Sequence, residues 1–276
     1  MTDRYVVIGH PVAHSQSPRI HAMFAAQTGQ DIAYDKLLAP VDGFKDAVRQ
    51  FVSGGGRGAN VTLPFKLEAY ELADQVSERA RYAKAANTLS FADGQIAADN
   101  TDGVGLVRDI ENNLGFELKD RRVLLMGAGG AARGVLLPLL QARPGSLVIA
   151  NRTVEKAAQL VHSIQHGAVR VRVKTAASGF DQLSGQQFDL VVNATSSSLS
   201  DQMPPLPDDL FAPGALAYDM MYGKGLTSFL AFAEARQVER LADGLGMLVE
   251  QAAESFLIWR GVRPDTRPVM RVLRKG

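Results

Sequence analysis

The first chemical signal in this chain is the spacing of small residues near its middle. Gly127, Gly129 and Ala132 follow the pattern G-x-G-x-x-G/A. In that pattern the first glycine permits a tight turn, the second lets the backbone approach a pyrophosphate, and the third position lets helix and strand pack closely. Such clusters also mark ordinary strand-to-helix turns, so spacing alone leaves both a cofactor cradle and a plain turn open.

The flanking sequence favours the cradle. An apolar run at 123–126 precedes the glycines, and another at 135–140 follows them. These runs predict a buried strand, a turn and a helix whose free N–H groups face the phosphates. Pro138 lies within that helix and can bend it. We therefore interpret residues 127–134 as a dinucleotide-binding stretch.

The residues after the next expected strand, 146–150, indicate which dinucleotide binds. An NAD-binding unit places an Asp or Glu there, on the ribose 2′-hydroxyl. Asn151, Arg152 and Thr153 include no acid. Arg152, with Thr153 and Lys156, offers cations and a hydroxyl to a 2′-phosphate, a task that suits the planar guanidinium. Thr153 could instead cap a solvated helix, but the position after the second strand favours NADP.

Two serines follow the first expected strand, 5–9, in a strand-to-helix loop. The hydroxyls of Ser15 and Ser17 can donate hydrogen bonds to a bound anion. Ser17 precedes Pro18, a helix-start signal, so on pattern alone an N-cap role for Ser17 is the commoner one. The histidines of this region lack a compatible set of carboxylates, so we expect no metal site.

Another polar group gathers at the end of a short expected strand, 58–62. Asn60 and Thr62 lie on that strand, and Lys66 follows at the start of a helix. A lone lysine is usually a surface charge. Its position beside two hydrogen-bonding side chains, at the carboxyl end of a strand where ligands bind, makes Lys66 a candidate for chemistry.

A hairpin follows this group. Asp93-Gly94 is a turn signal between the expected strands 87–91 and 95–98. The second strand runs into Thr101 and Asp102, which open an apolar-periodic helix. Either residue could cap that helix, and the pattern leaves Asp102 evenly placed between a capping role and a chemical one.

Strands and helices continue to alternate after the cradle, as in an α/β protein. A helix is expected to end near His166, and another covers the apolar positions of 226–233. Thr195 follows the second of three further expected strands, at the edge where ligands bind in an open parallel sheet. These strands are 169–173, 189–193 and 215–219.

Composition limits the number of domains and the classes of partner and chemistry that the chain can have. A chain of 276 residues suits two domains. Its 30 Lys and Arg and 29 Asp and Glu leave a net charge of +1, which points to neither nucleic acid nor an anionic membrane. Without cysteine, disulfides and thiolate nucleophiles are excluded. No signal-like start or bilayer-spanning apolar run is found, so we expect a cytoplasmic monomer or homodimer with small-molecule partners.

Taken together, these stretches resemble the shikimate dehydrogenase family, and they occur in the family's order. The matching segments are Ser15-Gln16-Ser17-Pro18, Asn60 to Lys66, Ala86-Asn87-Thr88, Asn100 to Gly103, Gly127 to Ala131, Asn151-Arg152-Thr153, Asn193 to Ser196, Tyr218 to Tyr222, and Asp243 to Met247 with Gln251. One position departs from the pattern: Ser198 stands where a glycine is usual, which bears on the conformation of that loop.

The resemblance implies an α/β protein of two domains with a returning C-terminal segment. Residues 1–102 form an α/β substrate-binding and catalytic domain, and residues 103–240 form a Rossmann-like NADP-binding domain. Residues 241–276 form a helical segment that packs back on the first domain. The implied reaction is the reversible NADPH-dependent reduction of 3-dehydroshikimate to shikimate, in aromatic amino-acid biosynthesis.

The resemblance also assigns roles to single residues. Lys66 and Asp102 form the catalytic pair, with Lys66 able to deliver a proton as the cofactor delivers hydride. The residues that bind substrate are Ser15, Ser17, Asn60, Thr62, Asn87, Tyr222 and Gln251. The residues that bind NADP(H) are Gly127, Ala128, Gly129, Gly130, Ala131, Asn151, Arg152, Thr153, Lys156, Thr195, Met220 and Gly244.

Three other readings stay open. A quinate or quinate/shikimate dehydrogenase would share the architecture. A methylenetetrahydrofolate dehydrogenase-like enzyme would also combine a lysine-bearing domain with a dinucleotide-binding one. A noncatalytic NADPH sensor would keep the cradle alone, and the presence of both Lys66 and Asp102 argues against it.

Overall fold

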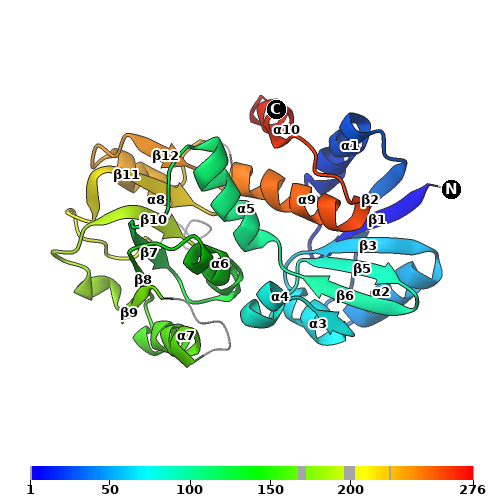
Figure 1. The fold of residues 1–276 in the computed structure, drawn as a ribbon, viewed down its shortest axis with the longest axis horizontal. Helices are drawn as coiled ribbons and strands as arrows, with labels where there is room; N and C mark the ends of the chain where they lie inside the picture. The colour runs from blue at the N-terminus through cyan, green and yellow to red at the C-terminus, as the bar shows by residue number, and fades with distance from the viewer. Residues whose placement is uncertain (1, 167–171, 196–202, 224, 276) are drawn as a thin grey trace. The chain divides into compact units, whose positions relative to one another are not determined.

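The computed structural model describes residues 2–166, 172–195, 203–223 and 225–275 (Figure 1). The chain forms two compact units, one from Met1–Gly105 with Leu248–Gly276 and the other from Leu106–Met247. Within the described residues, each unit is built on one six-stranded sheet. The chain therefore leaves the first unit once and returns to it, and both termini belong to that unit.

The first unit has a mixed sheet of order β2-β1-β3-β5-β6-β4. Parallel pairs join β1 to β2 and β3, whereas β5 runs antiparallel to both β3 and β6. The strands are β1 (Asp3–Gly9), β2 (Ile32–Leu38), β3 (Gly56–Val61), β4 (Gln75–Val76), β5 (Thr88–Ala92) and β6 (Gln95–Asp99). The helices are α1 (Ser17–Thr28), α2 (Phe44–Ser53), α3 (Lys66–Leu72), α4 (Glu78–Ala83), α9 (Leu245–Arg260) and α10 (Thr266–Arg274).

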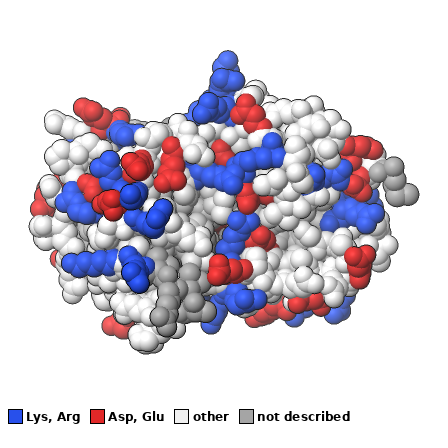
Figure 2. Space-filling model, viewed as in Figure 1, with Lys and Arg blue, Asp and Glu red and all other residues white. Residues whose placement is uncertain are grey.

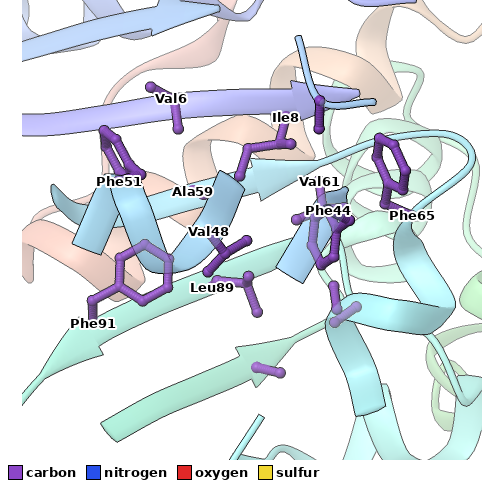
Figure 3. Close-up of a cluster of buried hydrophobic side chains, with 14 residues drawn as sticks. Val6, Ile8, Phe44, Val48, Phe51, Ala59, Val61, Phe65, Leu89 and Phe91 are labelled. Atoms are coloured by element: carbon purple, nitrogen blue, oxygen red, sulfur yellow. The ribbon is translucent and has the colours of Figure 1, made fainter. Parts of the chain in front are cut away.

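Alternation along β1 gives this sheet two buried faces, because successive strand side chains point to opposite sides. Val6 and Ile8 enter a cluster with Phe44 and Val48 of α2 (Figure 3). Tyr5 and Val7 enter a cluster on the other face with Tyr34 of β2. A further core joins α1 to α9 and α10 through Ile20, Phe24, Val249, Phe256 and Val269. The C-terminal helices thus complete the first unit.

Strand register brings the polar candidates of this unit to one sheet edge. Asn60 of β3 pairs with Thr88, and Thr88 pairs with Asp99 at the end of β6. Because β5 is antiparallel, its first residue lies where β1, β3 and β6 end. The segments that follow β1, β3 and β6, and the one that precedes β5, therefore converge.

The second unit has a wholly parallel sheet of order β12-β11-β10-β7-β8-β9. The strand order reverses between β7 and β10, which is where dinucleotides bind in folds of the Rossmann type. Its strands are β7 (Arg122–Met126), β8 (Ser146–Ala150), β9 (Lys174–Ser178), β10 (Phe188–Asn193), β11 (Phe211–Asp219) and β12 (Arg240–Ala242). Its helices are α5 (Asp102–Arg108), which begins in the first unit, the π-helix η1 (Asp109–Asn113), α6 (Gly130–Gln141), α7 (Val154–His166), the 3-10 helix η2 (Phe180–Gln182) and α8 (Ser228–Glu234).

A buried polar contact ties the start of this unit to its sheet. The Tyr218 hydroxyl, at the end of β11, donates to Asp109 Oδ2 at 2.7 Å. Burial, followed by the Asp109 charge, raises the pKa of Tyr218, so the phenol keeps its proton. A Cβ on Gly246 would fall 2.0 Å from Asp109 Oδ1, so glycine is required where the chain passes this carboxylate.

One expectation about local structure was wrong in its described part, and another was wrong. Of the expected strand at 169–173, residues 169–171 lie outside the described residues, and Arg172 and Val173 are not in a strand, because β9 begins at Lys174. Ser17 is the first residue of α1 rather than its N-cap, because Gln16 holds the cap position. The Ser15 hydroxyl accepts from the Ser17 amide at 3.3 Å instead.

Charge is mixed over the surface, in keeping with the net charge of +1. Figure 2 shows basic and acidic side chains interspersed on the face that it presents. No helix among the described residues combines the length and apolar character needed to cross a membrane.

Ile8 offers a direct test of the first unit's core. Its side chain is fully buried in the cluster under α2. We expect Ile8→Ala to lower the free energy of unfolding by about 2–5 kcal/mol, because the change removes buried methyl groups and leaves a cavity. Leu38→Ala, at a side chain that is 59% exposed, should change it by less than about 0.5 kcal/mol. Denaturant unfolding of both variants measures this; equal losses would contradict the assigned core.

Candidate active site

Lys66 and Asp102 form an ion pair at the convergent edge of the first unit. Lys66 Nζ donates to Asp102 Oδ2 at 2.5 Å. Lys66 begins α3 just after β3, and Asp102 begins α5 just after β6. Their side chains are 29% and 12% exposed, so the lysine reaches solvent while the carboxylate is nearly enclosed. The ammonium group of Lys66 is therefore partly open to solvent while it contacts the carboxylate of Asp102.

Asn87 holds this pair in place. Its Nδ2 lies 2.8 Å from Asp102 Oδ1 and 3.2 Å from Gln251 Oε1. Its Oδ1 accepts from the Thr101 amide at 2.9 Å and from the Thr88 hydroxyl at 2.9 Å. One buried carboxamide thus fixes the chain around Asp102 and contacts α9 as well.

The helix start at Asp102 is served by a different side chain. Asn100 Oδ1 accepts from the Asp102 amide at 3.2 Å. The Asp102 carboxylate bonds Lys66 and Asn87, and the Thr101 hydroxyl bonds the Asn87 side chain. Both side chains therefore bond other side chains rather than the first amides of the helix, and the chemical role of Asp102 stays a prediction.

Behind Asn87 lies a second buried amide, Asn60. Its Nδ2 lies 3.0 Å from Ser255 Oγ on α9 and 3.1 Å from the Asn87 carbonyl. Its Oδ1 accepts from the Tyr34 hydroxyl at 2.7 Å. Burial raises the pKa of Tyr34, so this phenol remains a donor. Both the oxygen and the nitrogen of the Asn60 amide therefore have hydrogen-bond partners in the protein.

An imidazole packs behind this layer. His21 stacks on Tyr34 with ring centroids 4.2 Å apart. Burial lowers the pKa of His21 to about 3, so the ring is neutral at physiological pH. His21 is a packing residue, as expected from its sequence context.

The remaining candidates of the first unit lie around the same edge. Ser15 donates to Ser17 at 3.1 Å, just after β1. Thr62 directly follows β3, and a Cβ on Gly9 would fall 2.4 Å from its methyl group. Gln251 of α9 donates from Nε2 to the Leu248 carbonyl at 2.7 Å and accepts from Asn87. The structure brings six of the seven predicted substrate residues into the first unit.

Tyr222 belongs to the second unit, after β11, and its side chain is 41% exposed. Its predicted contact with substrate stays a prediction. Ser196, in a segment that matches the family pattern, and Ser198, which departs from it, lie outside the described residues.

The predicted cofactor residues gather at the carboxyl edge of the second sheet. Register pairs Met126 with both Ala150 and Asn193, and pairs Asn193 with Asp219. The segments beginning at 127, 151, 194 and 220 therefore leave neighbouring strands side by side. Gly127 has a φ of +107°, and a Cβ there would lie 3.1 Å from the Ala194 carbonyl oxygen. Only glycine fits this turn without strain.

At the same edge, the segments at Met220 and Gly244 lie very close together. A Cβ on Gly244 would fall 2.1 Å from the Met220 carbonyl oxygen, so these two predicted cofactor residues touch through their backbones. Asp219 supports them: Oδ1 accepts from the Met221 amide at 3.0 Å and Oδ2 from Thr227 Oγ1 at 2.6 Å. Thr195 Oγ1 donates to Asn193 Oδ1 at 2.7 Å beside them.

The start of α6 and the residues after β8 fit the phosphate groups of a dinucleotide. Gly130 begins α6, so the first-turn N–H groups have no partner within the helix. A Cβ on Gly129 or Gly130 would meet no protein atom within 4 Å, which leaves open space over the helix start. After β8, Arg152 and Lys156 are exposed and form no ion pair with any residue that the structure describes. This edge can receive a pyrophosphate and, farther along, a second phosphate.

The second unit has a parallel sheet with a glycine cradle, and the first unit holds a Lys–Asp pair. These features are typical of a nucleotide-dependent oxidoreductase of two units. Sequence comparison identifies the family. Residues 7–89 match the Shikimate dehydrogenase substrate binding domain, residues 109–200 match Shikimate / quinate 5-dehydrogenase, and residues 244–274 match the Shikimate 5'-dehydrogenase C-terminal domain. The chain belongs to the shikimate dehydrogenase family.

Known proteins agree with this assignment over the full chain. The chain is 59% identical to a shikimate dehydrogenase (NADP(+)) of Nitrosospira multiformis, over 100% of this chain and 98% of that protein. It resembles the crystal structure of an Ael1 enzyme from Pseudomonas putida with a TM-score of 0.92 and 55% identity, covering 99% and 98% of the two chains. A Thermus thermophilus shikimate 5-dehydrogenase in complex with NADP(H) and shikimate matches with a TM-score of 0.86 and 31% identity, covering 99% of each chain.

Sequence reasoning missed several residues around the site. Thr88, Tyr34 and Ser255 complete the buried polar layer, and Arg79 and Glu254 flank it. Ser255 lies four positions after Gln251 on the same helix, so helical periodicity could have paired those two. No local signal joins Tyr34 or Arg79 to the site.

Gly127 provides a test of the cradle. We expect Gly127→Ala to weaken NADPH binding at least tenfold, because the added Cβ forces the turn away from its left-handed backbone and from Ala194. Gly185→Ala is a matched control, since Gly185 also has a positive φ, +75°, but faces open space. Fluorescence titration with NADPH should show the loss in the first variant alone. Equal affinities would contradict the assignment of the cradle.

Proposed function

We propose that the protein catalyses the reversible NADPH-dependent reduction of 3-dehydroshikimate to shikimate. The observation that carries this proposal is the Lys66–Asp102 pair, bonded through Asn87 to Gln251 among hydroxyl and amide side chains. Family membership over the whole chain supports it. The protein would act on this small molecule in the cytoplasm, as a monomer or homodimer.

In this proposal the proton comes from the first unit. NADPH, when bound, supplies the hydride that reduces the ring ketone. Lys66 Nζ donates a proton to the oxygen as negative charge develops there, and the amine is left neutral. In the reverse direction the neutral amine acts as the base and takes the proton of the hydroxyl group. Asp102 accepts from Lys66 and orients its ammonium group. Asn87 fixes the other carboxylate oxygen, so the lysine cannot swing freely.

The substrate's other groups have partners of suitable chemistry. Ser15 and Ser17 would donate to the carboxylate, and Thr62, Asn87, Gln251 and Tyr222 would contact ring hydroxyls or the carboxylate end. Asn60 would contact them as well, and its bonds to Tyr34 and Ser255 would hold its amide, Asn87 and α9 in place.

The cofactor would lie along the carboxyl edge of the second sheet. Residues 127–131 would surround the pyrophosphate, and Asn151, Arg152, Thr153 and Lys156 would surround the adenosine 2′-phosphate. Met220 and Gly244 would lie beside the nicotinamide, and Thr195 would also contact the cofactor. The exposed cations at Arg152 and Lys156, with no acid among residues 151–153 directly after β8, favour NADP over NAD.

Quinate is a second candidate substrate, because residues 109–200 match a family described as shikimate / quinate 5-dehydrogenase. Initial rates with shikimate or quinate, each with NADP+ or NAD+, distinguish the two. The proposal expects the highest kcat/KM for shikimate with NADP+. A higher value for quinate would contradict it, and cofactor binding without turnover of any substrate would support a sensor.

Lys66 is the residue on which the chemistry depends. We expect Lys66→Met to lower kcat by about 10²- to 10⁴-fold, because a positioned proton donor is lost, with KM for shikimate changed far less. The control Lys45→Met removes an exposed lysine of α2 and should leave both constants unchanged. Steady-state kinetics of both variants measures the difference. Near-normal turnover in Lys66→Met would remove this lysine from the reaction.

Arg152 tests the choice of cofactor. We expect Arg152→Glu to reduce kcat/KM for NADP+ by at least tenfold relative to NAD+, because a carboxylate would repel the 2′-phosphate and can accept from a ribose hydroxyl. Lys119→Glu makes the same change of charge at an exposed site elsewhere in the second unit. Its ratio of NADP+ to NAD+ should match the parent protein. An unchanged ratio in Arg152→Glu would refute the phosphate assignment.

A further inference from the structure

Arg79 of α4 bridges two elements of the first unit that carry site residues. Its guanidinium makes a two-pronged contact with Asp99, through Nε to Oδ1 at 2.6 Å and Nη2 to Oδ2 at 2.9 Å. Its Nη1 and Nη2 each lie 3.2 Å from Glu254 Oε1. Asp99 ends β6, and Glu254 lies on α9, so one side chain joins a strand end to a helix.

The Asp99 contact leads directly to the catalytic segment. Asp99 Oδ1 also accepts from the Asn100 amide at 2.6 Å, and the Asp99 carbonyl accepts from the Asn87 amide at 3.0 Å. Asn100 in turn accepts from the Asp102 amide. A shift of Asp99 would therefore move both Asn87 and Asp102.

The Glu254 contact leads to the helix that carries Gln251. Glu254 follows Gln251 by almost one turn, and Ser255 on the same helix bonds Asn60. The rotation of α9 about its axis decides whether Gln251 reaches Asn87. Arg263 holds the same face of α9, with Nη1 2.9 Å from Glu254 Oε2 and Nη2 2.5 Å from Glu250 Oε2.

Electrostatics makes these contacts strong. Glu254 and Asp99 have side chains 10% and 20% exposed, so each carboxylate has little water to stabilise its charge. Burial acts to lower the pKa of Arg79, but the hydrogen bonds and charges of Asp99 and Glu254 outweigh it and raise the pKa. Removing Arg79 would leave Asp99 with the neutral donors Ser77 and Asn100, which costs more than losing an exposed ion pair, whereas Glu254 would keep Arg263.

We propose that Arg79 is a positioning residue that sets the geometry of the active site through two separate contacts. Through Asp99 it holds Asn87 and Asp102, on which proton transfer by Lys66 depends. Through Glu254 it holds the α9 face that directs Gln251 at the substrate. The inference rests on the proposed shikimate dehydrogenase activity. It assigns Arg79 a kinetic role without direct contact with the substrate.

Isosteric variants separate the two contacts. In Asp99→Asn and Glu254→Gln, an amide presents a donor to a guanidinium where the carboxylate presented an acceptor. We expect Asp99→Asn to lower kcat by about tenfold to a hundredfold, because small displacements of reacting groups are that costly, with a much smaller rise in KM for shikimate through Asn87. Glu254→Gln should raise KM for shikimate by about tenfold with kcat nearly unchanged. Arg79→Met should do both and leave the Kd of NADPH unchanged.

Controls decide between positioning and mere stability. Arg122→Met breaks a comparable Arg–Asp pair with Asp189 in the second unit and should change neither kcat nor KM for shikimate. Arg79→Lys keeps the charge and should recover part of the loss seen in Arg79→Met. The assays run well below the melting temperature of each variant. If the parent enzyme oxidises shikimate and the variants differ from it only in melting temperature, the positioning role is overturned.

The same set distinguishes failure of the inference from failure of the proposed function. A parent protein that does not turn over shikimate overturns the proposed function itself. A parent protein that does, with Asp99→Asn and Glu254→Gln altering kcat and KM in the same proportion, overturns the two-contact account. Should Arg79→Met fail to fold, the two isosteric variants carry the test by themselves.

Discussion

The first unit depends on keeping one charged pair, Lys66 and Asp102, in a largely enclosed position. A carboxylate with little access to water must be compensated by a cation and by hydrogen-bond donors. Asp102 has one of each: Lys66 on one oxygen and Asn87 on the other. These contacts join segments that follow β3 and β6 and precede β5. The positions of Lys66 and Asp102 therefore depend on the strand register that brings those strand ends together.

The mixed sheet explains how three distant segments reach one another. A wholly parallel sheet would place the residue before β5 at the opposite edge. The antiparallel β5 instead begins where β3 and β6 end, and its register pairs Thr88 with both Asn60 and Asp99. The second unit has a wholly parallel sheet, and its strand order creates an edge for a dinucleotide. Its strand reversal between β7 and β10 opens the edge where the glycine turn and the α6 start can approach a dinucleotide.

Local sequence patterns predicted those parts of the structure that depend on local physics. The apolar run 146–150 is β8, and the turn at Gly127 needs a positive φ that its type indicated. The hairpin around Asp93-Gly94 formed as predicted, with β5 and β6 paired antiparallel. The expected strand at 169–173 was wrong at Arg172 and Val173, its described residues, because alternation describes any half-exposed extended segment and does not specify a partner strand.

Contacts between distant segments could not be predicted in this way. Tyr34 and Asn60 are bonded across strands, and Asn60 reaches Ser255 near the other end of the chain. Arg79 and Tyr218 likewise find carboxylates through tertiary packing. The resemblance to a family named the residues expected at the site, but only the fold distinguishes Asn60, whose amide is bonded to protein, from Lys66, which remains accessible.

The central claim is that Lys66 and Asp102 act as one unit in proton transfer. A double-mutant cycle in kcat for shikimate oxidation tests it, using Lys66→Met, Asp102→Asn and the double variant. The account predicts strong non-additivity, with the double variant no more than about threefold slower than the slower single variant. Losses that multiply as independent effects would contradict the claim.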